Sequence, residues 1–282
     1  MVVATLLALG SALVHASWNL LIKTGRDRVL AGWGQFLAAA VVAWVTLCFI
    51  GYPGWEAAPY LVATGIVHVA YLEWLVAAYH HGDFSIAYPL ARGSGAVLAA
   101  VGAWVVLDDV MSGAAWVAIA IAAVGLVSLR WTTNPDASSD GVAMLYALGT
   151  GVAISAYSLI DSAGARAVDS GVSYGVASVG AAGTAITLAN LARPSRRGRS
   201  TELLLDWRRH LAGGVGTLVA YTMVLVAVRQ APVGYVTMLR ESSVVLGALV
   251  GWLFLGEPMG GRRLMSSAVV CAGLIALIVV GG

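Results

Sequence analysis

Charged side chains are scarce in this 282-residue sequence. Only 11 % of the residues are Asp, Glu, Lys or Arg, whereas 60 % are apolar, and the mean hydropathy is +0.86. Soluble domains carry about 25 % charged residues, so a soluble fold would lack the polar surface needed to cover this many apolar side chains. The composition therefore excludes a large soluble domain and predicts an integral membrane protein.

Cysteine is also rare, and motifs of common catalytic sites are missing. Cys48 and Cys271 each lie inside an apolar run, with no CxxC or Cys/His cluster nearby, so neither a disulfide framework nor a zinc site is predicted. The chain has no Gly-rich phosphate loop ending in Gly-Lys-Ser/Thr, no HExxH and no GxSxG. We therefore expect no catalytic residues, no metal and no cofactor. The small net charge of +2 also argues against a nucleic-acid partner.

Ten apolar segments follow one another along the chain, each long enough to cross a bilayer core of about 30 Å or close to it. The polar stretch 131–140 separates them into two groups of five, which we expect to form two five-helix units over residues 1–131 and 140–282. The predicted spans are 2–22, 29–50, 58–79, 84–106, 111–129, 141–160, 171–192, 211–229, 233–255 and 264–281.

Unusual residues recur between the two groups at two offsets. A shift of 148 positions superposes residues 84–129 on 232–277, and a shift of 139 superposes the starts of the two units. Since each unit has five crossings, the second must enter the membrane from the opposite side. We predict an all-α polytopic membrane protein whose ten transmembrane helices form two inverted five-helix repeats. The matched pairs include Arg92 with Arg240, Asp109 with Glu257, Gly125 with Gly273, and Trp18-Asn19 with Tyr157-Ser158.

Basic residues gather on one side of the predicted membrane. Twelve Lys and Arg residues lie in the loops after the odd-numbered segments, and only Arg166 and Arg229 lie in loops on the other side. Cytoplasmic loops carry the excess of Lys and Arg, so this bias predicts that the odd-numbered loops are cytoplasmic and both termini are outside. We expect a multi-pass protein of the cell (inner) membrane.

Four charged residues lie well inside predicted spans, away from their ends, where a charge costs on the order of 2.5 to 3.5 kcal/mol on insertion scales. They are Arg92, Arg240, Glu73 and Glu241. In a functional interpretation they line a water-filled cavity, where an arginine binds an anionic group of the substrate. In a structural interpretation they pair with neighbouring acids or satisfy free backbone carbonyls. The sequence leaves both open.

Helical spacing adds polar neighbours to these charges. Tyr88 shares a helix face with Arg92, Thr237 precedes Arg240 by three residues, and His15 lies on the face that carries Trp18 and Asn19. Glu73 and His15 are the candidate proton-coupling residues, because both titrate and both lie in predicted spans. The candidate substrate-binding residues are Arg92, Arg240, Tyr88, Trp18, Asn19, Tyr157 and Thr237.

With these residues in view, the chain resembles the drug/metabolite transporter superfamily, in particular its ten-helix EamA-like proteins. The resemblance rests on the opening run 16–23, the run 87–92 and the closing Leu255-Gly256-Glu257; the first half departs with Leu107-Asp108-Asp109 at the corresponding place. It implies secondary active transport of a small metabolite by alternating access, without ATP hydrolysis. We expect an amino acid or another small organic anion as the substrate, and efflux as the direction.

Other functions stay open at this stage. An exporter of organic cations or drugs would use Glu73 with Trp18 and Tyr157 through carboxylate and cation–π contacts. A flippase for lipid-linked substrates would need a lateral opening, and an intramembrane enzyme would have to use Glu73, His68 or the His80-His81 pair. The expected partners are a small-molecule substrate and the lipid bilayer, with protons and a second copy of the chain as further candidates.

Overall fold

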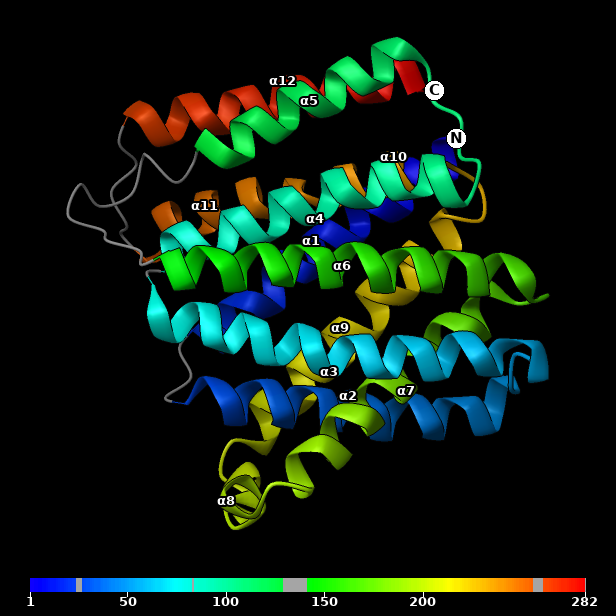
Figure 1. Cartoon of the computed structure of the whole chain (residues 1–282), viewed down its shortest axis with the longest axis vertical. Helices are drawn as coiled ribbons and strands as arrows, with labels where there is room; N and C mark the ends of the chain where they lie inside the picture. Colours follow the sequence, from blue (N-terminus) through cyan, green and yellow to red (C-terminus); the bar gives the residue numbers. More distant parts are fainter. Residues whose placement is uncertain (24–26, 83, 129–140, 256–260, 282) are drawn as a thin grey trace.

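The computed structural model is a bundle of helices that run roughly side by side, with both chain termini at the same end (Figure 1). It describes residues 1–23, 27–82, 84–128, 141–255 and 261–281. Within these ranges, the side chains at 18–23, 28, 84–86, 248, 250–255 and 262–263 lie outside the description. The predicted link 131–140 and the Leu255-Gly256-Glu257 motif also fall outside it.

The long helices agree with most of the predicted spans. In the first half they are α1 (Val2–Lys23), α2 (Arg28–Ile50), α3 (Ala58–His81), α4 (Phe84–Val106) and α5 (Gly113–Ser128). In the second half they are α6 (Gly141–Ala167), α7 (Gly171–Leu191), α9 (Trp207–Ala227), α10 (Val233–Arg240), α11 (Ser242–Leu255) and α12 (Gly261–Gly281). Shorter elements are η1 (Trp55–Ala57), α8 (Pro194–Arg197) and η3 (Ser200–Leu204).

Among the described residues, seven helices are long and apolar enough to cross a membrane. Val2–Ser17 and Gly113–Ser128 are shorter apolar helices. The predicted all-helical, multi-pass membrane architecture is therefore confirmed. The seven are Val29–Ile50, Trp55–His81, Ala87–Val106, Gly141–Ala167, Gly171–Leu191, Trp207–Ala227 and Leu264–Gly281.

The predicted span 233–255 is divided into α10 and α11 at Glu241, which corrects the expectation of one uninterrupted helix. The Glu241 N–H donates to the carbonyl of Met238 at 3.0 Å, and the Val244 N–H donates to the carbonyl of Glu241 at 3.0 Å. These bonds connect residues three apart instead of four, so the helix tightens at this point. Glu241 therefore lies at a break in the helix.

Helix α6 continues to Ala167, seven residues beyond the predicted end of its span. The sequence prediction ends the span just before the charged Asp161. Arg229 satisfies the carbonyls that follow, because its guanidinium donates to Ala165 at 2.7 Å, Val168 at 2.6 Å and Asp169 at 3.0 Å. A basic side chain at the carboxyl end of a helix stabilises that end in this way.

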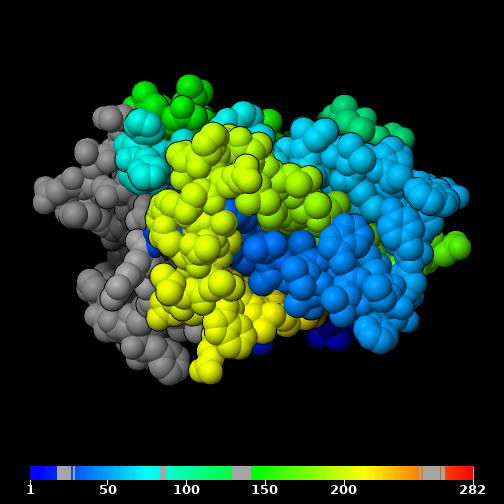
Figure 2. Space-filling view, turned by 90° about the horizontal axis from the view of Figure 1, so that it is seen from below, coloured from blue at the N-terminus to red at the C-terminus, as the bar shows by residue number. Residues whose placement is uncertain are grey.

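Helices from the two halves interleave. α3 packs against α6 and α7, α9 packs against α1 and α2, and α4 packs against α6 and α10. α2 also packs against α7, and these helices lie side by side in Figure 2, where α2 is blue and the α7-to-α9 region is yellow-green to yellow. We call the end of the bundle that carries α8 and η3 the basic end, and the end that carries both termini the terminal end (Figure 1).

Helices α5 and α12 form a pair at one edge of the bundle (Figure 1). One glycine on each helix allows the two backbones to approach closely. A Cβ atom added at Gly125 would lie 2.7 Å from the backbone nitrogen of Val270, and one added at Gly273 would lie 2.5 Å from that of Ala122. Both neighbours are backbone atoms, which cannot rotate away. The two glycines are therefore required for the close approach.

Gly125→Ala and Gly273→Ala are each expected to destabilise the protein, because the new methyl group forces the backbones of α5 and α12 apart. We expect the apparent Tm in detergent to fall for each, as followed by intrinsic tryptophan fluorescence. Gly247→Ala is the matched control: a Cβ there meets nothing within 4 Å, and alanine favours a helix by about 0.5–1 kcal/mol over glycine. A loss of Tm at Gly247 equal to that at Gly125 would contradict this account.

Candidate functional site

The repeat-related arginines lie on α4 and α10, two helices that pack closely together. A Cβ at Gly234 would lie 2.7 Å from the Cβ of Ala100, so small residues allow this approach. Arg92 and Arg240 are both buried, each with 8 % of its surface exposed. Both act electrostatically on the same groups, which include Glu241 and Tyr157. The two arginines therefore belong to one buried cluster.

Arg92 forms an ion pair with Glu241 across the α4–α10 contact. The Arg92 Nη2 lies 2.7 Å from Glu241 Oε1, and Nε donates to Oε2 at 3.2 Å, a two-point contact. The exposed fractions of the two side chains are only 9 % and 5 %. This pair neutralises one arginine and agrees with the structural interpretation for Arg92.

Arg240 differs from its repeat counterpart. Its guanidinium carbon lies 5.7 Å from the centroid of the Tyr221 ring, a cation–π contact. In the part of the chain that the structure describes, no carboxylate lies within ion-pair distance of Arg240. The shift of 148 explains the difference: Glu241 corresponds to residue 241 − 148 = 93, which is Gly93. The first half therefore supplies no acid for Arg240.

Aromatic rings surround the two arginines. His68 stacks on Tyr157 with ring centroids 4.3 Å apart, and Tyr71 meets Tyr157 edge to face at 5.6 Å. The ring centroid of Tyr221 lies 6.0 Å from that of Tyr157. Tyr71 also interacts electrostatically with Arg92 and Arg240. Helices α3, α6 and α9 thus each contribute a tyrosine to the cluster.

Asp161 is a completely buried carboxylate that the sequence analysis missed. Its Oδ1 accepts hydrogen bonds from Ser178 at 2.9 Å and Tyr174 at 3.2 Å. Its Oδ2 accepts from Thr64 at 2.9 Å and Tyr221 at 2.6 Å. The available signal was helical spacing, because Asp161 follows Tyr157 by one turn and shares its face. The prediction ended the span one residue too early to use it.

The structure brings several other predicted residues to this cluster. His15 of α1 interacts electrostatically with Arg92 and Arg240, and Tyr88 of α4 interacts with both arginines and with Glu241. Thr237 is buried, and its hydroxyl donates to the carbonyl of Val233 at 2.8 Å, within its own helix. The side chains of Trp18 and Asn19 lie outside the described residues.

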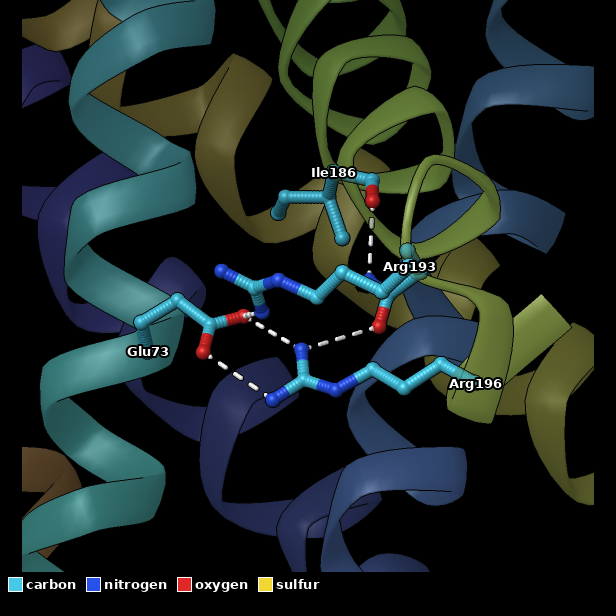
Figure 3. Close-up of polar contacts among 5 residues, drawn as sticks. Glu73, Ile186, Arg193 and Arg196 are labelled. Carbon is cyan, nitrogen blue, oxygen red and sulfur yellow. Dashed lines mark hydrogen bonds and ion pairs between the residues drawn. The ribbon is translucent and has the colours of Figure 1, made fainter.

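Glu73 lies apart from this cluster, at the basic end. Figure 3 shows its carboxylate facing the guanidinium groups of Arg193 and Arg196. The Nη2 of Arg196 donates to Oε2 of Glu73 at 3.0 Å, and its Nη1 donates to Oδ1 of Asn190 at 3.1 Å. Asn190 in turn donates to the carbonyl of Ile186 at 2.8 Å. Glu73 thus ties α3 to the end of α7.

A second ionic contact at the basic end joins the start of α2 to η3. Arg199 donates to Asp27 Oδ2 at 2.8 Å and to Glu202 Oε1 at 2.9 Å. The Arg199 guanidinium lowers the pKa of the Glu202 carboxyl below its ordinary value. Both carboxylates therefore stay ionised at neutral pH and keep the contact intact.

The terminal end is held by Asp109, which follows α4. Arg166 donates two hydrogen bonds to this carboxylate, from Nη1 to Oδ1 at 2.7 Å and from Nη2 to Oδ2 at 3.0 Å. Oδ2 also accepts from the N–H of Val233, at 2.7 Å, where α10 begins. Arg166 further donates to the carbonyl of Val228 at 2.9 Å. This network connects α4, α6 and α10 on the side opposite Glu73.

The Arg92–Glu241 pair is expected to stabilise the protein only as a pair. Glu241→Gln leaves two buried arginines without an anion, and breaking a buried pair in this way costs about 3–5 kcal/mol. Compared with Glu241→Gln, the double variant Arg92→Gln/Glu241→Gln buries one fewer positive charge, so it is expected to recover part of the lost stability. Unfolding of the wild type, Arg92→Gln, Glu241→Gln and the double variant in detergent measures the coupling. A double variant as unstable as the sum of the single changes would contradict a direct pair.

Comparison with known proteins supports the fold and finds a family model that matches the second half of the chain. A solved structure titled "Crystal structure of protein" superposes with a TM-score of 0.78 over 99 % of this chain and 97 % of that chain, at 15 % identity, which establishes a shared fold. No curated protein matches the chain significantly. Residues 141–279 match the EamA-like transporter family, so the resemblance expected from the sequence is confirmed. The second half of the chain is thus similar to the EamA-like transporter family.

Proposed function

We propose that this protein is a secondary active transporter of a small organic anion. It works by alternating access between two inverted five-helix repeats, residues 1–131 and 140–282, in the cell membrane. The observation that carries the proposal is Arg240, a buried arginine with no carboxylate partner among the described residues, beside an arginine that is already neutralised.

A buried guanidinium without a counter-ion is costly, and an anionic ligand removes that cost. Its planar fork matches carboxylate and phosphorus oxyanion groups, which accept two parallel hydrogen bonds. Arg240 would bind the anionic group, while His15, Tyr88 and Tyr157 supply polar and aromatic contacts around it. Arg92 would act mainly by holding Glu241, so that Glu241 does not occupy Arg240.

The helix contacts support the two inverted repeats. If α1, α2, α3, α4 and α5 correspond to α6, α7, α9, α10–α11 and α12, then the α3–α6 contact corresponds to α9–α1, and α2–α9 corresponds to α7–α3. α2 packs on its own counterpart α7, as α5 does on α12. The pair Gly125–Val270 becomes Gly273–Ala122 under the same exchange, since 122 + 148 = 270 and 125 + 148 = 273. Such reciprocal contacts are those of a two-fold axis.

Ten crossings follow when the shorter apolar helices are counted with the seven long ones. α1 and α5 each supply one crossing, and α10 with α11 supplies another across the break at Glu241. The basic end then faces the cytoplasm, because Arg193, Arg196 and Arg197 lie there. Both termini are placed outside.

The ionic contacts at the two ends suit alternating access. Opening the basic end would separate Glu73 from Arg193 and Arg196, whereas opening the terminal end would separate Asp109 from Arg166. Each side therefore has a contact that must break for the substrate to pass, while the other can remain closed. Motion of this kind about a site near the midplane is typical of inverted-repeat transporters.

The cation-exporter alternative receives less support. It requires Glu73 as the ligand of an organic cation, but this carboxylate is already paired with two arginines at the basic end. Tyr157 stacks on His68 within a cluster that holds two buried arginines. A cation would meet repulsion from both of them.

Arg240 is expected to be required for anion binding. The detergent-purified protein is tested by thermal shift with L-glutamate, methylphosphonate, glycerol 3-phosphate and choline, since a ligand at 100 times its Kd stabilises the native state by about 2.7 kcal/mol. We expect one or more of the three anions to raise Tm and choline to leave it unchanged. Arg240→Ala should abolish the shift, and Arg240→Lys should weaken binding about tenfold or more because the fork is lost.

The matched control is Arg197→Ala, an exposed arginine of the basic end, which should retain the full shift. An Arg240→Ala protein stabilised by the same anions as the wild type would overturn the assignment, as would selective stabilisation by choline.

Both termini are expected to lie on the non-cytoplasmic side of the membrane. Alkaline phosphatase, which is active only outside the cytoplasm, should be active when fused after Gly282 and inactive when fused after Gly198 in the basic loop. Green fluorescent protein, which fluoresces in the cytoplasm, should give the reverse pattern at the two sites. An inactive phosphatase after Gly282, with fluorescence there, would show that the orientation is inverted.

A further inference from the structure

The hydroxyl cage around Asp161 is unlike the surroundings of the other buried acid. Glu241 is held by a guanidinium, which donates hydrogen bonds but cannot accept them. Asp161 is held by four hydroxyl groups from three other helices, and no basic group lies within ion-pair distance among the described residues. A hydroxyl can rotate from donor to acceptor, so this cage satisfies either an ionised or a protonated carboxyl. Asp161 can therefore change its protonation state without leaving a polar group unpaired.

A directed chain of hydrogen bonds leads to Asp161 from His68. The Nδ1 of His68 lies 2.9 Å from the carbonyl oxygen of Thr64 and 3.0 Å from its Oγ1. Since a carbonyl oxygen only accepts, the network assigns the proton to Nδ1 and leaves Nε2 as an acceptor. Thr64 Oγ1 then donates to Asp161 Oδ2 at 2.9 Å.

Proton transfer along this chain balances. A proton binds at Nε2 of His68, the Nδ1–H bond breaks as Thr64 Oγ1 gains that proton, and the original Thr64 hydroxyl proton moves to Asp161 Oδ2. His68 ends neutral in its other tautomer, Thr64 is unchanged, and Asp161 has gained one proton. Release reverses these steps.

Tyr221 connects this carboxyl to Arg240. Its hydroxyl donates to Asp161 Oδ2 at 2.6 Å, and its ring faces the Arg240 guanidinium at 5.7 Å. When Asp161 is ionised, its negative charge acts on Arg240 through the shared Tyr221, without an ion pair between them. Protonation of Asp161 removes that charge and so favours an anion at Arg240. By linkage, the bound anion favours the proton equally.

Most of the other titratable groups around Asp161 and Arg240 do not compete for this proton. Glu241 is paired with Arg92, tyrosines are neutral near pH 7, and arginines are always charged. His15 of α1 interacts electrostatically with both arginines and is a second histidine of this cluster that can bind a proton. The remaining groups of the cluster are Tyr60, His68 and Tyr71 of α3, Tyr88 and Arg92 of α4, Tyr157 of α6, Tyr174 of α7, Tyr221 of α9 and Arg240 of α10.

We infer that Asp161 is a proton-binding site, loaded through His68 and Thr64, that couples proton binding to anion binding at Arg240. This inference rests on the proposed function, because it takes the anion site at Arg240 as given. One proton would cross with each anion. An inward proton gradient then drives uptake, and efflux occurs only when an outward anion gradient exceeds it.

The wild-type protein tests the linkage without any substitution. L-glutamate keeps a constant charge between about pH 6 and pH 8, so protons taken up on binding must come to the protein. Calorimetry in buffers with different ionisation enthalpies should detect the uptake of up to about one proton per glutamate. The Kd for glutamate should increase as pH rises, by at most about tenfold per pH unit. Measurable glutamate binding with no proton uptake and a pH-independent Kd would overturn the inference.

Asp161→Asn mimics the protonated carboxyl and tests coupling in proteoliposomes. We expect this variant to bind glutamate with little pH dependence and to exchange labelled for unlabelled glutamate, but to lose accumulation driven by an imposed pH gradient. Asp169→Asn is the matched control: this exposed residue follows α6, and the variant should keep gradient-driven accumulation. Glu73→Gln separates the two carboxylates, since loss of accumulation there but not at Asp161 would move the proton site to Glu73.

The two proposals fail in different ways. If wild-type protein binds none of the anions in the panel, the proposed anion transport is wrong. If it binds and exchanges glutamate, but Asp161→Asn still accumulates glutamate along a pH gradient, only the proton site is wrong.

Discussion

The Arg92–Glu241 ion pair is the interaction on which the buried cluster depends. Charge in the interior of a membrane bundle is costly unless it is paired with another group. This pair balances one arginine and joins α4 to the junction of α10 and α11 at a single point. The break in the helix at Glu241, the packing of α4 on α10 and the isolation of Arg240 are all connected to it.

A difference between the two halves gives the cluster its chemistry. If each arginine had its own acid, the cluster would be electrically neutral and would have no unpaired charge to bind a charged solute. Glycine at position 93, where the second half has glutamate, removes one acid and leaves one arginine over. The backbone arrangement can thus stay close to two-fold symmetry while the charges do not. In the proposed function, this one difference between the matched segments gives Arg240 its preference for an anion.

Much of the helical architecture could be predicted from the sequence, because hydropathy sets where a helix must be buried in lipid. The prediction placed Arg92 and Arg240 at equivalent positions, since arginine is rare enough in an apolar chain for its recurrence to be informative. The partners of these residues were harder to predict. Whether Glu241 turns toward Arg92 or Arg240 depends on a local break in the helix, which hydropathy does not encode.

The hydroxyl cage of Asp161 was out of reach for a related reason. Its donors lie at residues 64, 174, 178 and 221, on three helices, and serine, threonine and tyrosine are common in such helices. The pairing of Glu73 was equally hidden, because it requires the segment after α7 to fold back over the end of α3. Long-range polar contacts need the three-dimensional arrangement, whereas burial in lipid does not.

The reciprocal glycine contacts between α5 and α12 constrain how the bundle can move. Helices in contact through side chains can slide as rotamers change, but helices in contact through their backbones cannot. Separation of α5 from α12 would therefore require their two backbones to part. In the proposed alternating access, we expect this pair to stay together and any opening to take place among the remaining helices.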